Sequence, residues 1–141
     1  MSGQYPFEKR YHYPHMRDED KAIWERFIDA YPGYYDSVDY DVPVGSPPDF
    51  STIVNLDTGG DDALLYKRKI DVVGYRVGGK DIIELKPKAD ARAFGQAIGY
   101  KTLYCRDVDP RTECTPTVIT DQIGRDMEEL AKEMGVKLLA A

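Results

Sequence analysis

Hydrophobic residues recur along the chain with two different periods, and these periods predict both helices and strands. A helical stripe runs through residues 18–31, where Asp18 is a candidate N-terminal cap and Pro32-Gly33 ends the pattern. A second helix is expected over about residues 90–104, and a third begins after Thr120, a candidate cap, and ends at Gly135. The apolar positions of the first helix are Ile23, Trp24, Phe27 and Ile28, and those of the third are Ile123, Met127, Leu130 and Met134.

Strands are predicted between and after these helices. SVDYDVPV, residues 37–44, reads as a short strand whose alternation is broken by Pro43. Two β-rich runs lie within KIDVVGYRVGGKDIIELKPK, residues 69–88, and the glycines of VGGK predict a two-residue hairpin turn. TPTVIT and VKLLAA supply two further strands. Residues 1–17 are aromatic-rich and aperiodic, so we expect an extended arm followed by a single domain over residues 18–141.

Length and composition favour one folded, soluble domain. The chain has 141 residues, of which 42% are hydrophobic and 31% charged. There is no apolar run long enough to span a bilayer, and the N-terminus lacks the apolar core of a signal peptide, which predicts a cytoplasmic location. Cys105 and Cys114 are expected to be free thiols, because a zinc site built from Cys and His would need every cysteine and histidine of the chain.

The charge is distributed unevenly, and the basic part surrounds the predicted hairpin. The chain carries a net charge of −6, yet residues 67–106 hold 10 Lys and Arg against 4 Asp and Glu. A local basic patch can bind phosphate even on an acidic protein. The candidate contacts are Lys67, Arg68, Lys69, Lys88 and Arg92. Ordinary solvated surface positions are the alternative interpretation of the same residues.

The hairpin places three charged residues among its Val and Ile positions. If Gly78 and Gly79 form the loop, Asp71 lies opposite Lys86 and diagonal to Glu84, all on one face. The opposite face, with Ile70, Val72, Ile83 and Leu85, is then the expected core side. Two carboxylates beside a lysine suit a Mg²⁺ ion that activates water against a phosphate. The open alternative is a cross-strand ion pair of Asp71 with Lys86, worth about 0–1 kcal/mol.

The spacing Asp71-x12-Glu84-x-Lys86 resembles the motif of the PD-(D/E)XK nuclease superfamily. QAIGY, from Gln96 to Tyr100, is similar to the Q-x3-Y motif of its RecB-like exonuclease branch. The predicted order of elements also looks like that superfamily. The resemblance implies an α/β, restriction-endonuclease-like αβββαβ core, with a mixed central sheet flanked by helices and a C-terminal α-β extension.

The resemblance also implies roles for individual residues. Asp71 and Glu84 would bind Mg²⁺ or Mn²⁺ together with the Leu85 carbonyl, and Lys86 would position the attacking water. Gln96 and Tyr100 would orient the scissile strand. Glu25, in the first helix, would be an additional acid, although an exposed helix acid is an equally open interpretation.

The function implied is a metal-dependent deoxyribonuclease, with DNA as the partner. The alternative is a nuclease-fold structural subunit of a phage virion or another DNA-handling assembly, without activity, because small isolated chains of this kind resemble phage-borne ones. Its location would then be the host cytoplasm or the virion. A third interpretation is a module whose basic face docks a protein. The arm aromatics Tyr5, Phe7, Tyr11 and Tyr13 are typical interface residues and suggest a homo-oligomer or a larger assembly held through the arm.

Overall fold

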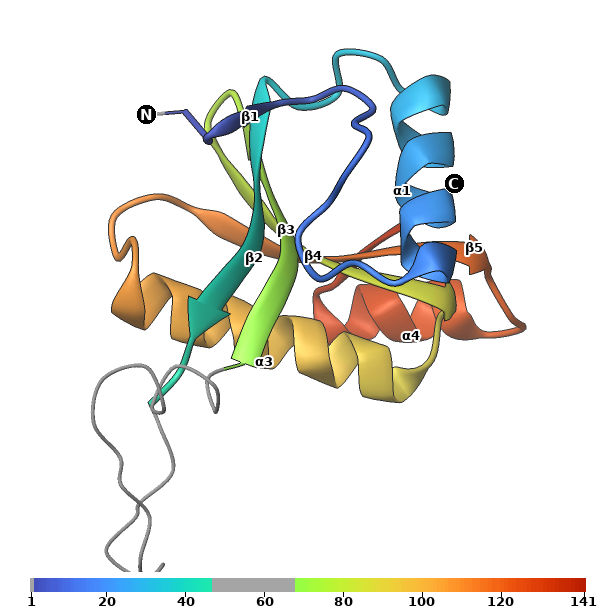
Figure 1. The fold of residues 1–141 in the computed structure, drawn as a ribbon. Helices are drawn as coiled ribbons and strands as arrows, with labels where there is room; N and C mark the ends of the chain where they lie inside the picture. Colours follow the sequence, from blue (N-terminus) through green and yellow to red (C-terminus); the bar gives the residue numbers. More distant parts are fainter. Residues whose placement is uncertain (1, 47–67) are drawn as a thin grey trace, which may run out of the picture.

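A six-stranded mixed sheet forms the centre of the computed structural model, which describes residues 2–46 and 68–141 (Figure 1). The strands follow one another across the sheet in chain order. The first four strands pair antiparallel with their neighbours. The fifth strand pairs parallel with the fourth, and the sixth pairs parallel with the fifth. The strands are β1 (Tyr5–Pro6), β2 (Ser37–Val44), β3 (Arg68–Arg76), β4 (Gly79–Lys88), β5 (Cys114–Gln122) and β6 (Lys137–Ala140).

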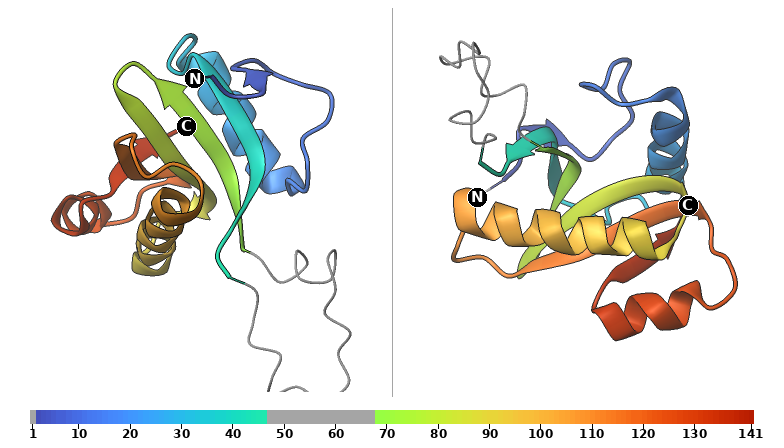
Figure 2. Two further views of the ribbon diagram at one scale, coloured as in Figure 1. Left: turned by 90° about the vertical axis from the view of Figure 1, so that its left-hand side faces the viewer. Right: turned by 90° about the horizontal axis from the view of Figure 1, so that it is seen from below.

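Helices cover both faces of this sheet. Helix α1 (Asp18–Ala30) packs on one face, and α3 (Ala91–Asp107) and α4 (Met127–Met134) lie on the other (Figure 2). Parallel neighbours need crossover connections, which α3 supplies between β4 and β5 and α4 between β5 and β6. The predicted α/β architecture is therefore confirmed: an αβββαβ core with a mixed sheet and an α-β extension.

Helix α1 forms as its apolar stripe predicts, but its N-terminal cap differs. Its buried side chains are Ile23, Trp24, Phe27 and Ile28, as expected. Arg17 occupies the cap position without a side-chain hydrogen bond, so the prediction of Asp18 as the cap was wrong. Asp18 instead belongs to an acidic first turn with Glu19 and Asp20, which interacts favourably with the positive end of the helix dipole.

The two remaining helices begin differently from each other. Asp90 caps α3, because its carboxylate accepts a hydrogen bond of 2.8 Å from the Ala93 N–H. The prediction that Thr120 caps the last helix was wrong: Thr120 is buried in β5 and its hydroxyl donates to the Gln122 carbonyl. Helix α4 begins seven residues later, and Gly135, with a φ of 72°, ends it as predicted.

Several side chains of residues 2–17 pack into the same core as the rest of the domain. Tyr5 pairs with Val38 through β1. Phe7 contacts the rings of Trp24, Phe27 and Tyr35. Tyr13 is buried and donates a hydrogen bond of 2.9 Å to Glu25. Among the four aromatic residues expected at an assembly interface, Tyr11 alone is fully exposed.

Two general features bear on the sequence-based expectations. None of the helices described for residues 2–46 and 68–141 is long and apolar enough to cross a membrane. Cys105 is partly exposed and Cys114 buried, and both are free thiols.

Candidate active site

The β3–β4 hairpin has a register that differs by two residues from the predicted one. Arg76 pairs with Gly79, so Val77 and Gly78 form the loop. Gly78 has a φ of 83°, the conformation that the second loop residue of a type II turn requires. Gly79 is the first residue of β4. Glycine is needed there because a Cβ would lie 2.8 Å from the Glu113 carbonyl oxygen. The prediction of a Gly78-Gly79 loop was therefore wrong, for a reason that lies in a distant segment.

This register brings the two acids of the hairpin directly together. The backbone ladder between β3 and β4 ends at the pair Val72–Ile83, and one further step places Asp71 opposite Glu84 instead of Lys86. Because side chains alternate between the two faces of a strand, a register shift of two residues leaves each side chain on its predicted face. At this step the Leu85 N–H donates to Asp71 Oδ2 at 2.9 Å. Across residues 2–46 and 68–141, Asp71 forms no ion pair with Lys86, so the cross-strand pair considered above is not present.

The four residues expected on the core side are all buried, but they divide between two clusters. Val72, Ile83 and Leu85 pack in the cluster beneath α1. Ile70 lies in a different cluster, together with Tyr100 and Tyr104 of α3. Because helices cover both faces of the sheet, the charged face of the hairpin is also a buried face.

Burial beside a like charge perturbs Glu84. Its side chain is only 5% exposed, and this burial is the main cause that raises its pKa far above the usual value of a carboxyl group. The negative charge of Asp71 and a hydrogen bond between the two side chains raise the pKa further. The positive charge of Lys86 opposes the shift without cancelling it. In the absence of a cation, Glu84 therefore retains its proton at neutral pH.

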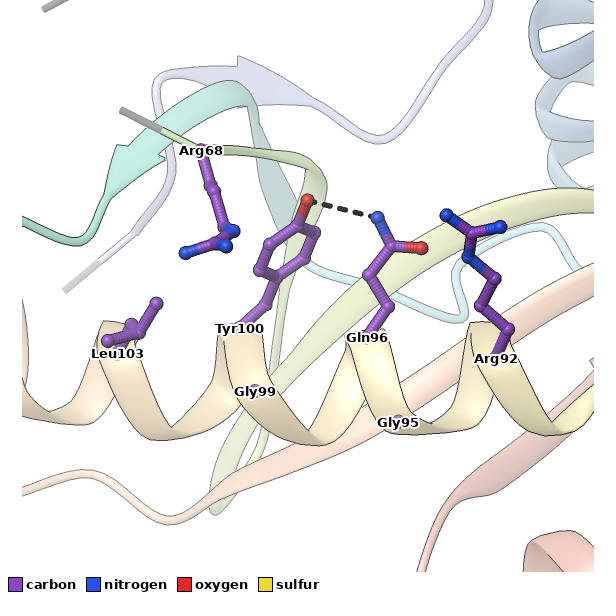
Figure 3. Close-up of a pocket in the computed structure, with 7 residues that line it drawn as sticks. All are labelled: Arg68, Arg92, Gly95, Gln96, Gly99, Tyr100 and Leu103. Carbon is purple, nitrogen blue, oxygen red and sulfur yellow. Dashed lines mark hydrogen bonds between the residues drawn. The ribbon is translucent and has the colours of Figure 1, made fainter. Parts of the chain in front are cut away.

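Helix α3 places Gln96 and Tyr100 at the same cavity as Asp71 and Glu84. The two residues lie one turn apart on one helix face, and the Gln96 amide donates to the Tyr100 hydroxyl at 3.2 Å (Figure 3). Burial, with the charges of Glu84 and Asp71 adding to it, raises the pKa of Tyr100. The phenol therefore stays neutral and keeps a proton to donate.

These residues line one polar cavity of about 220 Å³. Its walls come from the N-terminal segment, α1, the hairpin and α3. The five residues that the sequence predicts as catalytic all line it: Asp71, Glu84, Lys86, Gln96 and Tyr100. Leu85, the predicted carbonyl ligand, also lines it.

Helix α1 contributes Glu19 and Asp20 to this cavity, and not Glu25. Asp20 lines the cavity, and burial, followed by the charge of Asp71, raises its pKa to about 6. Glu25 does not line it, because its carboxylate accepts the hydrogen bond from Tyr13. A sequence signal for Asp20 exists: it lies three and four residues before Ile23 and Trp24, and so continues the buried stripe of α1 toward its N-terminus.

Sequence reasoning also missed the contribution of the N-terminal segment. His15 and Arg17 of this segment line the same cavity. His15 Nδ1 lies 2.5 Å from Asp41 Oδ2, and both residues have a positive φ. The aperiodic pattern of the segment gave no signal for this placement.

The predicted basic residues separate into three groups. Arg68 and Arg92 line a second cavity of about 410 Å³ along α3, which shares Gln96 and Tyr100 with the first. Lys69 lines the first cavity, 3.6 Å from Asp41. Lys88 is exposed and lines neither cavity, and Lys67 lies outside the described residues.

The donor set of the first cavity fits a hard divalent cation. The described part of the chain holds no preassembled metal centre of three or more His, Cys, Asp or Glu side chains. Mg²⁺, however, keeps several of its waters and binds proteins through one or two carboxylates. The carboxylates of Asp71 and Glu84, which repel each other in a buried position, are such ligands. The sequence also offers a competing cation site, the segment of residues 36–62 with its seven aspartates, but most of it lies outside the described residues.

Comparison with known proteins gives weak similarities to solved structures. No protein-family model matches the chain, and no curated protein sequence matches it. A complex of EndoMS with double-stranded DNA aligns over 94% of this chain with 14% identity and a TM-score of 0.49. A repair endonuclease from Pyrococcus abyssi aligns over 52% with 20% identity and a TM-score of 0.44. A protein of unknown function aligns over 82% with 18% identity and a TM-score of 0.46. The alignments cover 49%, 32% and 53% of those longer chains, respectively.

Proposed function

We propose that this chain is a metal-dependent deoxyribonuclease that hydrolyses phosphodiester bonds with Mg²⁺ or Mn²⁺ held by Asp71 and Glu84. The observation that carries the proposal is the buried Glu84 beside Asp71 in an open cavity that also contains Lys86. A fold gains nothing from a buried acid beside a second, partly exposed acid, because burial and mutual repulsion both oppose ionisation of the buried one. A site that binds a cation and a phosphate needs this arrangement.

The residues of the cavity supply complementary functions. When bound, the divalent cation supplies Lewis acidity and makes water a stronger nucleophile at neutral pH. The Leu85 N–H holds Asp71 in place through its hydrogen bond to Oδ2. Lys86 donates to the attacking water or to a phosphate oxygen, where its positive charge stabilises the charge that develops in the transition state. Gln96 and Tyr100 offer neutral N–H and O–H donors that orient the scissile phosphate.

Metal binding and protonation compete at Glu84. Because the raised pKa leaves a proton on Glu84, a cation must displace that proton to bind its carboxylate. We therefore expect metal affinity, and with it cleavage, to increase as the pH rises through neutrality.

The test is DNA cleavage by the purified chain. Linear and nicked DNA are incubated with Mg²⁺, with Mn²⁺ and with EDTA, using the wild type, Glu84→Ala and Glu128→Ala. Glu128 is a matched control, because it is an exposed acid on α4, outside the first cavity. We expect metal-dependent cleavage by the wild type and the control but not by Glu84→Ala. Absence of metal-dependent cleavage, or equal cleavage by all three proteins, would contradict the proposal and favour a structural subunit.

A further inference from the structure

The second cavity runs along one face of α3 beside the candidate active site. Arg92, Gly95, Gln96, Gly99, Tyr100 and Leu103 line it with the spacing of a single helix stripe, and Arg68 reaches it from the start of β3 (Figure 3). Gln96 and Tyr100 line both cavities. A ligand in the second cavity therefore reaches the carboxylates across these two side chains.

The two glycines of this stripe are not explained by packing. Both lie in the interior of α3, where glycine is the least favourable residue after proline. Both are exposed, and a Cβ added to either would meet no atom within 4 Å in the described part of the chain. The fold thus gives up helix stability at Gly95 and Gly99 without gaining a contact, and leaves bare backbone at the floor of the cavity.

The two cavities differ in how their charges are balanced. Arg68 and Arg92 line the second cavity, and none of the described acidic residues lines it. Neither arginine forms an ion pair within residues 2–46 and 68–141. The first cavity, by contrast, is mixed, because four acids line it together with Arg17, Lys69 and Lys86. The second cavity therefore offers an anionic substrate positive charge that no described acid offsets.

We propose that the second cavity binds the sugar-phosphate backbone of a single nucleic-acid strand, with Arg68 and Arg92 holding its phosphates and the bare backbone at Gly95 and Gly99 permitting its close approach. This inference rests on the proposed function, because it assigns the route by which the strand enters the active site. A cavity of about 410 Å³ has the size of one nucleotide and is too small to enclose a duplex, so one nucleotide of the strand enters it while its neighbours lie along α3.

The length of the stripe agrees with a short stretch of one strand. Arg92 and Tyr100 are eight residues apart on the helix. Arg68 lies beside Tyr100 (Figure 3). At about 1.5 Å per residue they are separated by about 12 Å along its axis. This distance corresponds to about three to four nucleotides of a stacked strand at about 3.4 Å each. The two arginines therefore bracket the part of the strand that lies next to Gln96 and Tyr100.

The first experiment separates binding from folding at the glycines. A fluorescent 12-nucleotide single-stranded DNA and the duplex of the same sequence are titrated by anisotropy in EDTA, so that no cleavage occurs. Gly95→Gln and Gly99→Gln extend a side chain over the cavity floor while improving helix propensity. We expect a higher midpoint of thermal unfolding and at least about tenfold weaker binding of the single strand. Thr102→Gln, an exposed position of α3 outside the cavity, serves as the control.

The second experiment tests the arginines through salt dependence. Each phosphate contact to a single strand contributes about 0.7 to the slope of log K against log salt concentration. Arg68→Gln/Arg92→Gln should therefore reduce this slope by about 1.4 and weaken binding equally for unrelated sequences. Lys132→Gln, which removes an exposed cation from α4, should leave both the affinity and the slope unchanged.

The outcomes keep this inference distinguishable from the proposed function. Wild-type affinity in the glutamine variants of the cavity, or an equal loss in the controls, overturns the inference even if the protein cleaves DNA with metal. Tighter binding of the duplex, weakened to the same degree by the variants, overturns the single-strand assignment. If the variants weaken strand binding as expected but no metal condition gives cleavage, the cavity assignment stands and the proposed hydrolysis fails.

Discussion

The two ends of strand β4 both bury charged side chains, but they treat the charge in opposite ways. At the first end, Asp81 is fully buried and accepts hydrogen bonds from Tyr35 at 2.7 Å and Arg76 at 2.9 Å, and it also pairs with Lys137. At the other end, Glu84 is buried beside another carboxylate, and its pKa is raised. Buried charges with partners of opposite sign are typical of structural contacts, whereas adjacent groups of like charge with a perturbed pKa are typical of functional sites.

Lys80 shows that the first end is matched on both faces of the sheet. Its ammonium group donates to the Tyr104 hydroxyl at 2.8 Å and lies 2.9 Å from the Asp109 carboxylate. Lys80 and Asp81 are neighbours on β4, so their side chains leave opposite faces. Each face supplies partners from different segments, and together these contacts connect β4 to α3, β6 and the segment after α1. This end of β4 is therefore stabilising, and the comparison predicts where substitutions damage the fold.

The largest expected effect is the loss of stability on removing Asp81. Asp81→Ala leaves the buried Tyr35 hydroxyl without its acceptor and two cations without their anion. Removing one partner of a buried pair costs about 3–5 kcal/mol, and we expect about 3 kcal/mol in the free energy of unfolding. The lower value applies because the Arg76 and Lys137 side chains remain 31% and 27% exposed. Urea denaturation measures the change.

The matched variant at the other end is Glu84→Gln. It replaces a buried, protonated carboxyl group by a neutral amide of the same shape, so the free energy of unfolding in EDTA should stay the same or increase. Equal destabilisation by Asp81→Ala and Glu84→Gln would show that both ends of β4 are structural.

The next prediction concerns the pH dependence of stability. Because the folded pKa of Glu84 lies above its unfolded value, the folded state holds more protons over the window between the two. The free energy of unfolding of the wild type should therefore decrease with rising pH between pH 5 and pH 7, by about 2 kcal/mol at roughly 1 kcal/mol per pH unit. Glu84→Gln should flatten this dependence. Thermal unfolding in EDTA across this range tests it, and an unchanged slope in the variant would remove Glu84 as the cause.

Features that depend on residues close in sequence could be predicted, whereas features that depend on distant residues could not. Periodicity located β2 and the apolar stripe of α1, because both depend on residues that are close in sequence. The hairpin register was missed by two residues, because Gly79 is required by the carbonyl of Glu113, 34 positions away. The common face of Asp71 and Glu84 survived this error, since a shift by two preserves the alternation.

Long-range partners explain the remaining differences. Nothing near Lys80 or Asp81 in the sequence indicates burial, because Tyr35, Asp109 and Lys137 come from distant segments. Pairing of buried charges by remote residues has no periodic signature. The exchange of Glu25 for Asp20, in contrast, was accessible from the sequence, since Asp20 lies on the stripe that the apolar residues of α1 define.

A smaller effect is expected from metal binding itself. At a concentration of Mg²⁺ ten times its dissociation constant, the wild type should gain about 1.4 kcal/mol of stability. Differential scanning fluorimetry with a Mg²⁺ titration measures the corresponding increase in Tm. Asp71→Asn/Glu84→Gln should abolish it. A shift that persists in this double variant would place the cation elsewhere, with the acidic segment 36–62 as the first alternative.

The smallest expected effect distinguishes Asp20 from Glu25, both in α1, as the additional acid that assists metal binding. Asp20 is close enough to Asp71 for its pKa to be raised to about 6, so near pH 7 it adds negative charge to the cavity. Asp20→Asn should therefore weaken Mg²⁺ binding by about threefold, equal to about 0.7 kcal/mol, a typical worth for one partly screened charge. Glu25→Gln is the matched control, because Glu25 accepts the hydrogen bond from Tyr13 and lies outside the cavity. Isothermal titration with Mg²⁺ at pH 5 and pH 7.5 measures both variants. The difference between wild type and Asp20→Asn should shrink at pH 5, where Asp20 is mostly protonated. Weaker binding by Glu25→Gln, together with wild-type binding by Asp20→Asn, would return the additional acid to the position first expected from the sequence.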